Sequence, residues 1–138
     1  MINAPAEWDP SLNLGHDLTD KQHRALFDMI LELDRRVSKG EFGQGVLDAL
    51  QGMKIYAASH FAAEESFMAR AGWPKLAQHQ GLHGEFLQKT SMFGGEALID
   101  SEWTSLDLLR FLLIWLVKHV KVQDREFFDW IAANRPSA

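Results

Sequence analysis

Two pairs of residues have the types and the spacing of metal ligands. His60 and Glu64 are four positions apart, and so are His79 and His83. Residues four apart lie on the same face of a helix, so each pair can direct its side chains toward one point. Imidazole and carboxylate groups bind metals, whereas thiolate chemistry is excluded because the chain has no cysteine. The spacing therefore indicates a metal site made of nitrogen and oxygen donors.

Five histidines and one glutamate interrupt the apolar stripes of the segments with helical periodicity. They are His23, His60, Glu64, His79, His83 and His119. A buried polar group without a partner costs about 1–3 kcal/mol, and a small domain has only about 5–15 kcal/mol of net stability. A single histidine on such a stripe would be a hydrogen-bonded core residue, but six polar residues together favour a shared metal. His16 lies off every stripe, and we expect it at the surface or packed against the N-terminal arm.

Asp124 becomes a seventh candidate ligand if the last helix is irregular. It follows His119 by five residues, which is about 140° around a regular α-helix, so the two would not share a face. In the same stretch the apolar stripe shifts by one residue, to Asp124, Phe127 and Ile131. A π-bulge inserts one residue into a helix face and is frequent at functional sites. We therefore expect a π-bulge between His119 and Asp124.

Glycine and proline divide the chain into four long segments. The breaks lie at residues 39–45, at Gly72–Pro74 and at Gly94–Gly95. Glycine commonly ends a helix, and proline is common in the first turn of the next one. Between Val46 and Ala71 the inward positions alternate in spacings of four and three residues, which is typical of a bundle seam. We predict an all-α protein, an up-down-up-down four-helix bundle with an N-terminal arm.

Length and composition limit the possible functions. The 138 residues suffice for one domain, and we predict an arm over residues 1–18, anchored by Trp8, and a bundle over residues 19–133. The net charge is −5 and no basic cluster occurs, so nucleic acid is not an expected partner. The longest apolar run, Phe111–Val117, is far shorter than the ~20 residues that span a bilayer. The start has no signal-peptide pattern. We expect a cytoplasmic protein without membrane insertion.

These motifs resemble those of the hemerythrin family, specifically its bacterial single-domain members. The resemblance lies in residues 20–23, 60–65, 79–83 and 115–124 and extends over nearly the whole chain. It implies two iron ions with an oxo or hydroxo bridge that bind O2 reversibly, for O2 carriage, storage or delivery. It further implies that one iron is held by His79, His83 and His119. The other iron is held by His23 and His60, and both irons are bridged by Glu64 and Asp124.

The resemblance also implies an apolar pocket that keeps water away from bound O2. Its expected lining residues are Leu26, Phe61, Trp115 and Leu116. Glu65, next to a predicted ligand, is expected to be a solvated neighbour. The resemblance implies that the small ligand is O2, with NO as an alternative. It does not identify a protein that receives O2.

Three other functions could also use a site with these ligands. A diiron oxygenase or ferroxidase would use Glu-x-x-His pairs, which the seams lack, so a diiron enzyme of the peroxidase or oxidase type is an alternative that we expect at most as a side activity. A module that senses O2, NO or redox state is the second alternative. We expect carriage instead, because such modules are usually joined to an output domain. A structural zinc site needs only four ligands, so seven candidates disfavour it.

Overall fold

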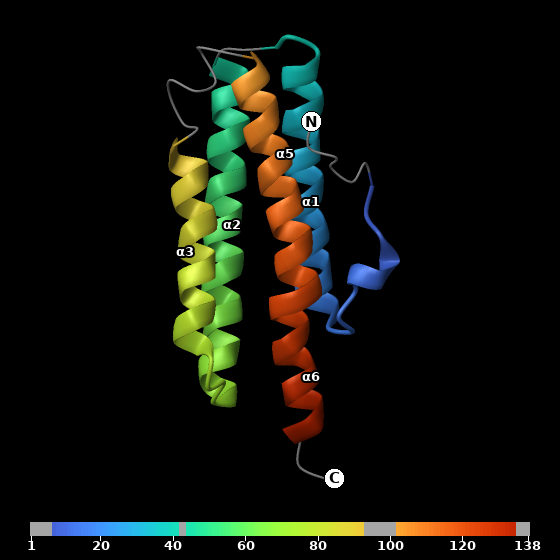
Figure 1. Ribbon diagram of the computed structural model, residues 1–138, viewed down its shortest axis with the longest axis vertical. Coiled ribbons are helices and arrows are strands. Elements are labelled where there is room, and N and C mark those ends of the chain that lie inside the picture. Colours follow the sequence, from blue (N-terminus) through green and yellow to red (C-terminus); the bar gives the residue numbers. More distant parts are fainter. Residues whose placement is uncertain (1–6, 42–43, 93–101, 135–138) are drawn as a thin grey trace.

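The computed structural model describes residues 7–41, 44–92 and 102–134, and this part of the chain is helical without a strand. The long helices are α1 (Asp17–Ser38), α2 (Gln44–Ala71), α3 (Leu76–Met92) and α5 (Glu102–Lys118). α5 continues through a π-helical segment, η3 (His119–Asp124), into α6 (Arg125–Asn134). Successive helices run in opposite directions (Figure 1), and α1 packs against both α2 and α5. The predicted up-down-up-down bundle is confirmed.

Two of the predicted breaks coincide with turns that need glycine. Gly40 and Gly72 have φ angles of +79° and +76°, in the left-handed region that favours glycine. Beyond Gly72, the N–H of Trp73 donates to the carbonyl of Met68 at 2.9 Å and closes the end of α2. The predicted break at Gly94–Gly95 lies outside the described residues.

The N-terminal arm is held against the bundle at two points. The short 3₁₀ turn η1 (Pro10–Leu12) precedes α1. The Trp8 ring packs edge-on against Phe27, with ring centroids 5.6 Å apart, which confirms Trp8 as an anchor. The guanidinium of Arg125 donates to the carbonyls of Ser11 (2.9 Å) and Asn13 (3.0 Å). The arm is thereby tied to the helix that follows η3.

His16 has a structural role at the start of α1. Its Nδ1 accepts a hydrogen bond from the backbone N–H of Thr19 at 3.3 Å, as an N-cap residue does. Its ring packs against Phe67 and Phe128, with centroids 5.3 and 5.6 Å apart. His16 therefore packs against α2 and α6 of the bundle, outside the apolar stripes as expected.

Apolar side chains form two clusters at different levels of the bundle. The main cluster joins α1, α2, α3 and α5 and includes Leu26, Ile30, Met53, Phe61, Phe86, Leu112 and Leu116. The end cluster lies near the turn between α2 and α3 and contains Met68, Trp73 and Phe127. Along α2, His60 and Glu64 fall between Ala57 of the main cluster and Met68 of the end cluster. The predicted ligands therefore occupy a polar layer between two apolar ones.

Among the described residues, no helix is both long and apolar enough to cross a membrane.

Candidate metal centre

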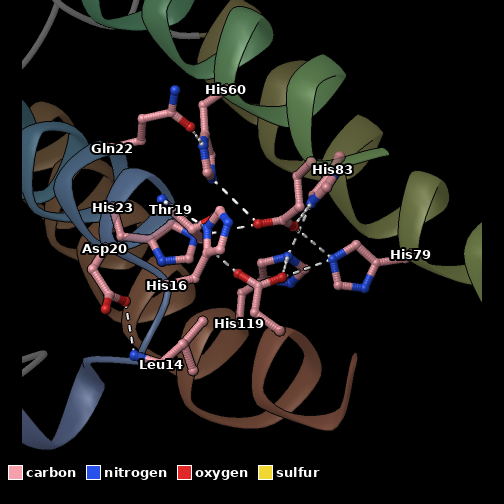
Figure 2. Close-up of polar contacts among 12 residues, drawn as sticks. Leu14, His16, Thr19, Asp20, Gln22, His23, His60, His79, His83 and His119 are labelled. Carbon is pink, nitrogen blue, oxygen red and sulfur yellow. Dashed lines mark hydrogen bonds and ion pairs between the residues drawn. The ribbon is translucent and has the colours of Figure 1, made fainter. Parts of the chain in front are cut away.

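All seven predicted ligands meet in one buried layer, which we call the metal layer. Figure 2 labels its histidines. None of their side chains is more than 4% exposed. Three long helices and the π-helical segment that continues α5 supply them: His23 from α1; His60 and Glu64 from α2; His79 and His83 from α3; and His119 and Asp124 from η3. The spacing of four within α2 and within α3 puts each pair on the inward face, as expected.

The two oxygens of Glu64 face different sets of imidazoles. Oε1 lies 3.0 Å from Nε2 of His79 and 3.2 Å from Nε2 of His83. Oε2 lies 3.3 Å from Nε2 of His23 and 3.5 Å from Nε2 of His60. The carboxylate therefore stands between two groups of donors.

Asp124 repeats this division from the other side of the layer. Its Oδ1 lies 2.8 Å from Nε2 of His79 and 3.2 Å from Nε2 of His119, and its Oδ2 lies 3.1 Å from Nε2 of His23. The donor atoms accordingly form two sets, in each of which all atoms lie within 4.8 Å of one another. The sets are Glu64, His79, His83, His119 and Asp124; and His23, His60 and Glu64.

These distances fit donors around a metal. Two donors bound at about 2.1 Å and at right angles are about 3.0 Å apart, close to the 2.8–3.5 Å between facing atoms of the layer. Several of the facing atoms are also buried without a hydrogen bond, namely Nε2 of His23 and His60, Oε2 of Glu64 and both carboxylate oxygens of Asp124. Buried polar atoms without partners are costly. Cations would satisfy them together, and imidazole with carboxylate is a donor set that iron accepts.

The segment η3 explains how residues five apart share one face. The N–H of Arg125 donates to the carbonyl of Val120, five residues earlier, as in a π-turn. The wider turn brings both His119 and Asp124 inward, at 2% and 0% exposure, while Val122 between them is 50% exposed. The predicted π-bulge is confirmed.

Close contacts between imidazoles and carboxylates keep the carboxylates ionised and favour protonated imidazoles. Burial alone would lower the pKa of His23 and His79, but the nearby carboxylates of Asp124 and Glu64 outweigh it and raise each pKa to about 9. Burial and the charge of Glu64 would raise the pKa of Asp124, yet the nearby imidazoles of His119 and His23 lower it to about 2. The facing imidazoles likewise hold the pKa of Glu64 well below its usual value despite burial. Protons and metal ions therefore compete for the same Nε2 atoms.

Two residues outside the predicted set orient imidazoles from behind. Nδ1 of His60 donates to the amide oxygen of Gln22 at 2.7 Å, and Nδ1 of His83 donates to Oε2 of Glu65 at 2.7 Å. Protonation at Nδ1 leaves Nε2 free to face the centre of the layer. The sequence pattern indicates neither contact, and Glu65 was expected to be only a solvated neighbour. Its side chain is 24% exposed, but it bonds to a predicted ligand.

Two of the four predicted pocket residues, Phe61 and Trp115, stack on imidazoles of the metal layer. Phe61 stacks on His83, with ring centroids 4.0 Å apart and an angle of 8° between the rings. Trp115 stacks on His119 at 4.6 Å and 12°. Phe61 and Trp115 face each other with centroids 6.3 Å apart, and both belong to or pack against the main cluster that contains Leu26 and Leu116. Apolar side chains thus cover the layer on the side of the main cluster.

Comparison with known proteins agrees with this arrangement. Residues 14–131 match the family model described as "Hemerythrin HHE cation binding domain". A bacteriohemerythrin of Clostridium acetobutylicum is 31% identical over 127 residues, which cover 88% of this chain and 98% of that protein. A bacteriohemerythrin of Stenotrophomonas maltophilia is 30% identical over 138 residues, covering 92% and 82%. A hemerythrin-like protein of Naegleria gruberi is 29% identical over 126 residues, covering 91% and 93%.

Proposed function

The chain belongs to the hemerythrin family, and from this premise we propose that it binds O2 reversibly at a diiron centre in the metal layer. The observation that carries the proposal is the division of two carboxylates between two groups of imidazoles. One oxygen of Glu64 and one of Asp124 face the first group, and the other oxygens face the second. Such carboxylates are suited to bridging two cations.

The donor count makes the two iron positions unequal. The first position would offer an iron three imidazoles, one oxygen from each carboxylate and a solvent-derived bridge, which would be a full set of six. The second would offer two imidazoles with the same three shared ligands, which would leave one place for a small molecule. When bound, the two irons supply the electrons that hold O2 and take them back on its release. The imidazoles of the two positions are His79, His83 and His119; and His23 and His60.

The surrounding residues favour binding over turnover. Phe61, at 2% exposure, and Leu116, at 1%, exclude water from the side of the main cluster. Leu26 is fully buried one turn from His23, and Trp115 covers the face of His119. None of these four side chains can donate or accept a proton near the open position as an acid or base. An apolar cover of this kind slows loss of electrons from the centre and supports reversible O2 binding.

The proposal is tested by iron analysis and visible spectroscopy on the purified protein. We expect about two irons per chain, a coloured oxidised form that bleaches on reduction, and a distinct spectrum when O2 is admitted that reverses when O2 is removed. If the reduced protein passes directly to the oxidised form without that distinct spectrum, carriage of O2 is wrong and a redox enzyme or sensor is the better account.

A pair of histidine variants tests the assignment of ligands. His60→Ala should lower iron content because its Nε2 faces the layer. His16→Ala is the matched control, since His16 caps α1 outside the layer, and it should retain about two irons. Equal iron content in the two variants would contradict the assignment.

A further inference from the structure

The two halves of the metal layer differ in the groups that stand behind their imidazoles. His83 donates from Nδ1 to the carboxylate of Glu65, and His60 donates from Nδ1 to the neutral amide of Gln22 (Figure 2 shows the latter). Both hydrogen bonds are 2.7 Å long, so they differ in the charge of the acceptor and not in distance. Nδ1 of His23 and of His119 has no partner among the described residues.

The bond between His83 and Glu65 is well placed to influence a metal. The His83 side chain is 2% exposed and that of Glu65 is 24% exposed, so the bond is shielded while the carboxylate keeps some hydration. Phe61 lies flat on the His83 ring at 4.0 Å and stops the ring from turning away. A hydrogen bond to an ionised acceptor is roughly twice as strong as one to a neutral acceptor. A carboxylate behind an imidazole also makes its other nitrogen a stronger donor to a metal.

We propose that Glu65 is a positioning residue that makes the two metal positions unequal. Through His83 it strengthens metal binding at the position of His79, His83 and His119 and stabilises the oxidised metal there, relative to the position of His60 that is backed by Gln22. The inference rests on the proposed pair of metal ions. The first position also has one more imidazole, so the contribution of Glu65 has to be isolated by substitution.

Titration of the metal-free protein with Co²⁺ isolates it without any need for O2. Glu65→Gln keeps a hydrogen-bond acceptor of the same size and removes the charge. We expect the tighter of two Co²⁺ binding steps to weaken by about 10- to 100-fold, with the weaker step unchanged. Gln22→Glu is the reciprocal variant and should tighten the weaker step.

The midpoint potential of the iron-loaded protein is a readout that a merely structural role would not move. Glu65→Gln should raise this potential, because the oxidised metal should lose more affinity than the reduced metal. Each tenfold difference between the two losses of affinity corresponds to about 59 mV. Glu85→Gln is the matched control. It removes the same charge from an exposed residue of α3, two positions after His83, and should leave both Co²⁺ steps and the potential unchanged.

Two results overturn the inference. One is a Glu65→Gln variant with unchanged tight Co²⁺ binding and unchanged potential, and the other is a Glu85→Gln variant that shifts as much. If Glu65→Gln does not fold, Gln22→Glu decides, because an unchanged weaker step also contradicts the inference. Failure of the diiron proposal looks different, since the unsubstituted protein would then bind fewer than two Co²⁺ ions.

Discussion

The metal layer and the main cluster are built from the same helices but gain stability in different ways. In the main cluster, Ile30 and Leu112 are fully buried, and burying such a side chain contributes about 1.5–3 kcal/mol without any ligand. In the metal layer, His23 and Asp124 are equally buried, yet their inward atoms lack hydrogen bonds. Apolar packing therefore stabilises the fold by itself, whereas we expect the polar layer to reach its full stability only when it binds cations.

The largest expected effect comes from removing a shared carboxylate. Asp124→Ala should reduce iron from about two to less than one per chain, because its oxygens face imidazoles of both groups. Because metal binding adds to folding free energy, the difference in melting temperature between loaded and metal-free protein should collapse. Iron analysis and thermal unfolding measure both effects. Asp129→Ala, on the exposed side of α6, is the control, and full iron loading of Asp124→Ala would show that the layer does not depend on this residue.

A deletion in the main cluster should give the opposite pattern. Leu112→Ala removes a fully buried side chain and should cost about 2–5 kcal/mol of unfolding free energy. The loss should be the same in metal-free and iron-loaded protein, with iron content unchanged, because Leu112 lies about two turns from His119. Urea unfolding of both forms measures it. A loss of unfolding free energy confined to the iron-loaded form would contradict the view that the main cluster stabilises the fold independently of metal.

The metal-free layer should make stability depend on pH. The pKa of His23 is raised to about 9 in the folded chain, so its contribution is full below the unfolded value of about 6.5 and disappears as pH rises through 9. The pKa of Asp124 is lowered to about 2, so its contribution is present above about 3.9 and disappears as pH falls through 2.

We therefore expect the metal-free protein to be most stable between about pH 4 and 6.5 and to lose stability from pH 6.5 to 9. The iron-loaded protein should not show the loss at high pH, because metal replaces the protons on the imidazoles. Urea unfolding at stepped pH compares the two forms. A parallel decline in the unfolding free energy of both forms would mean that the metal layer is not the source of the pH dependence.

The smallest expected effect is on the rate of autoxidation and concerns the border between the metal layer and the main cluster. Leu116 and Leu109 are both 1% exposed on α5, so changing either to alanine should cost similar stability. Only Leu116→Ala should speed autoxidation of the O2-bound protein, by about tenfold, which corresponds to about 1.4 kcal/mol. The decay of the O2-bound spectrum gives the rate, with iron content as a control. Equal rates in the two variants would mean that Leu116 has no part in excluding water.

Local periodicity made much of the fold and of the site predictable. The spacing of four within α2 and within α3 placed His60 with Glu64 and His79 with His83 on inward faces. Even the π-bulge was visible, as a one-residue shift of the apolar stripe before Asp124. The contacts of Gln22 and Glu65 were not predictable, because they join residues 38 and 18 positions apart on different helices.

The sequence by itself determined which side chains face inward, since a helix repeats every 3.6 residues and inward polar residues interrupt an apolar stripe. Tertiary structure alone decided how the oxygens of Glu64 and Asp124 are divided between two groups of imidazoles. It also decided that a carboxylate stands behind His83 and an amide behind His60. These relations depend on the relative height and rotation of neighbouring helices, which are set by how their side chains pack and not by any spacing along one helix.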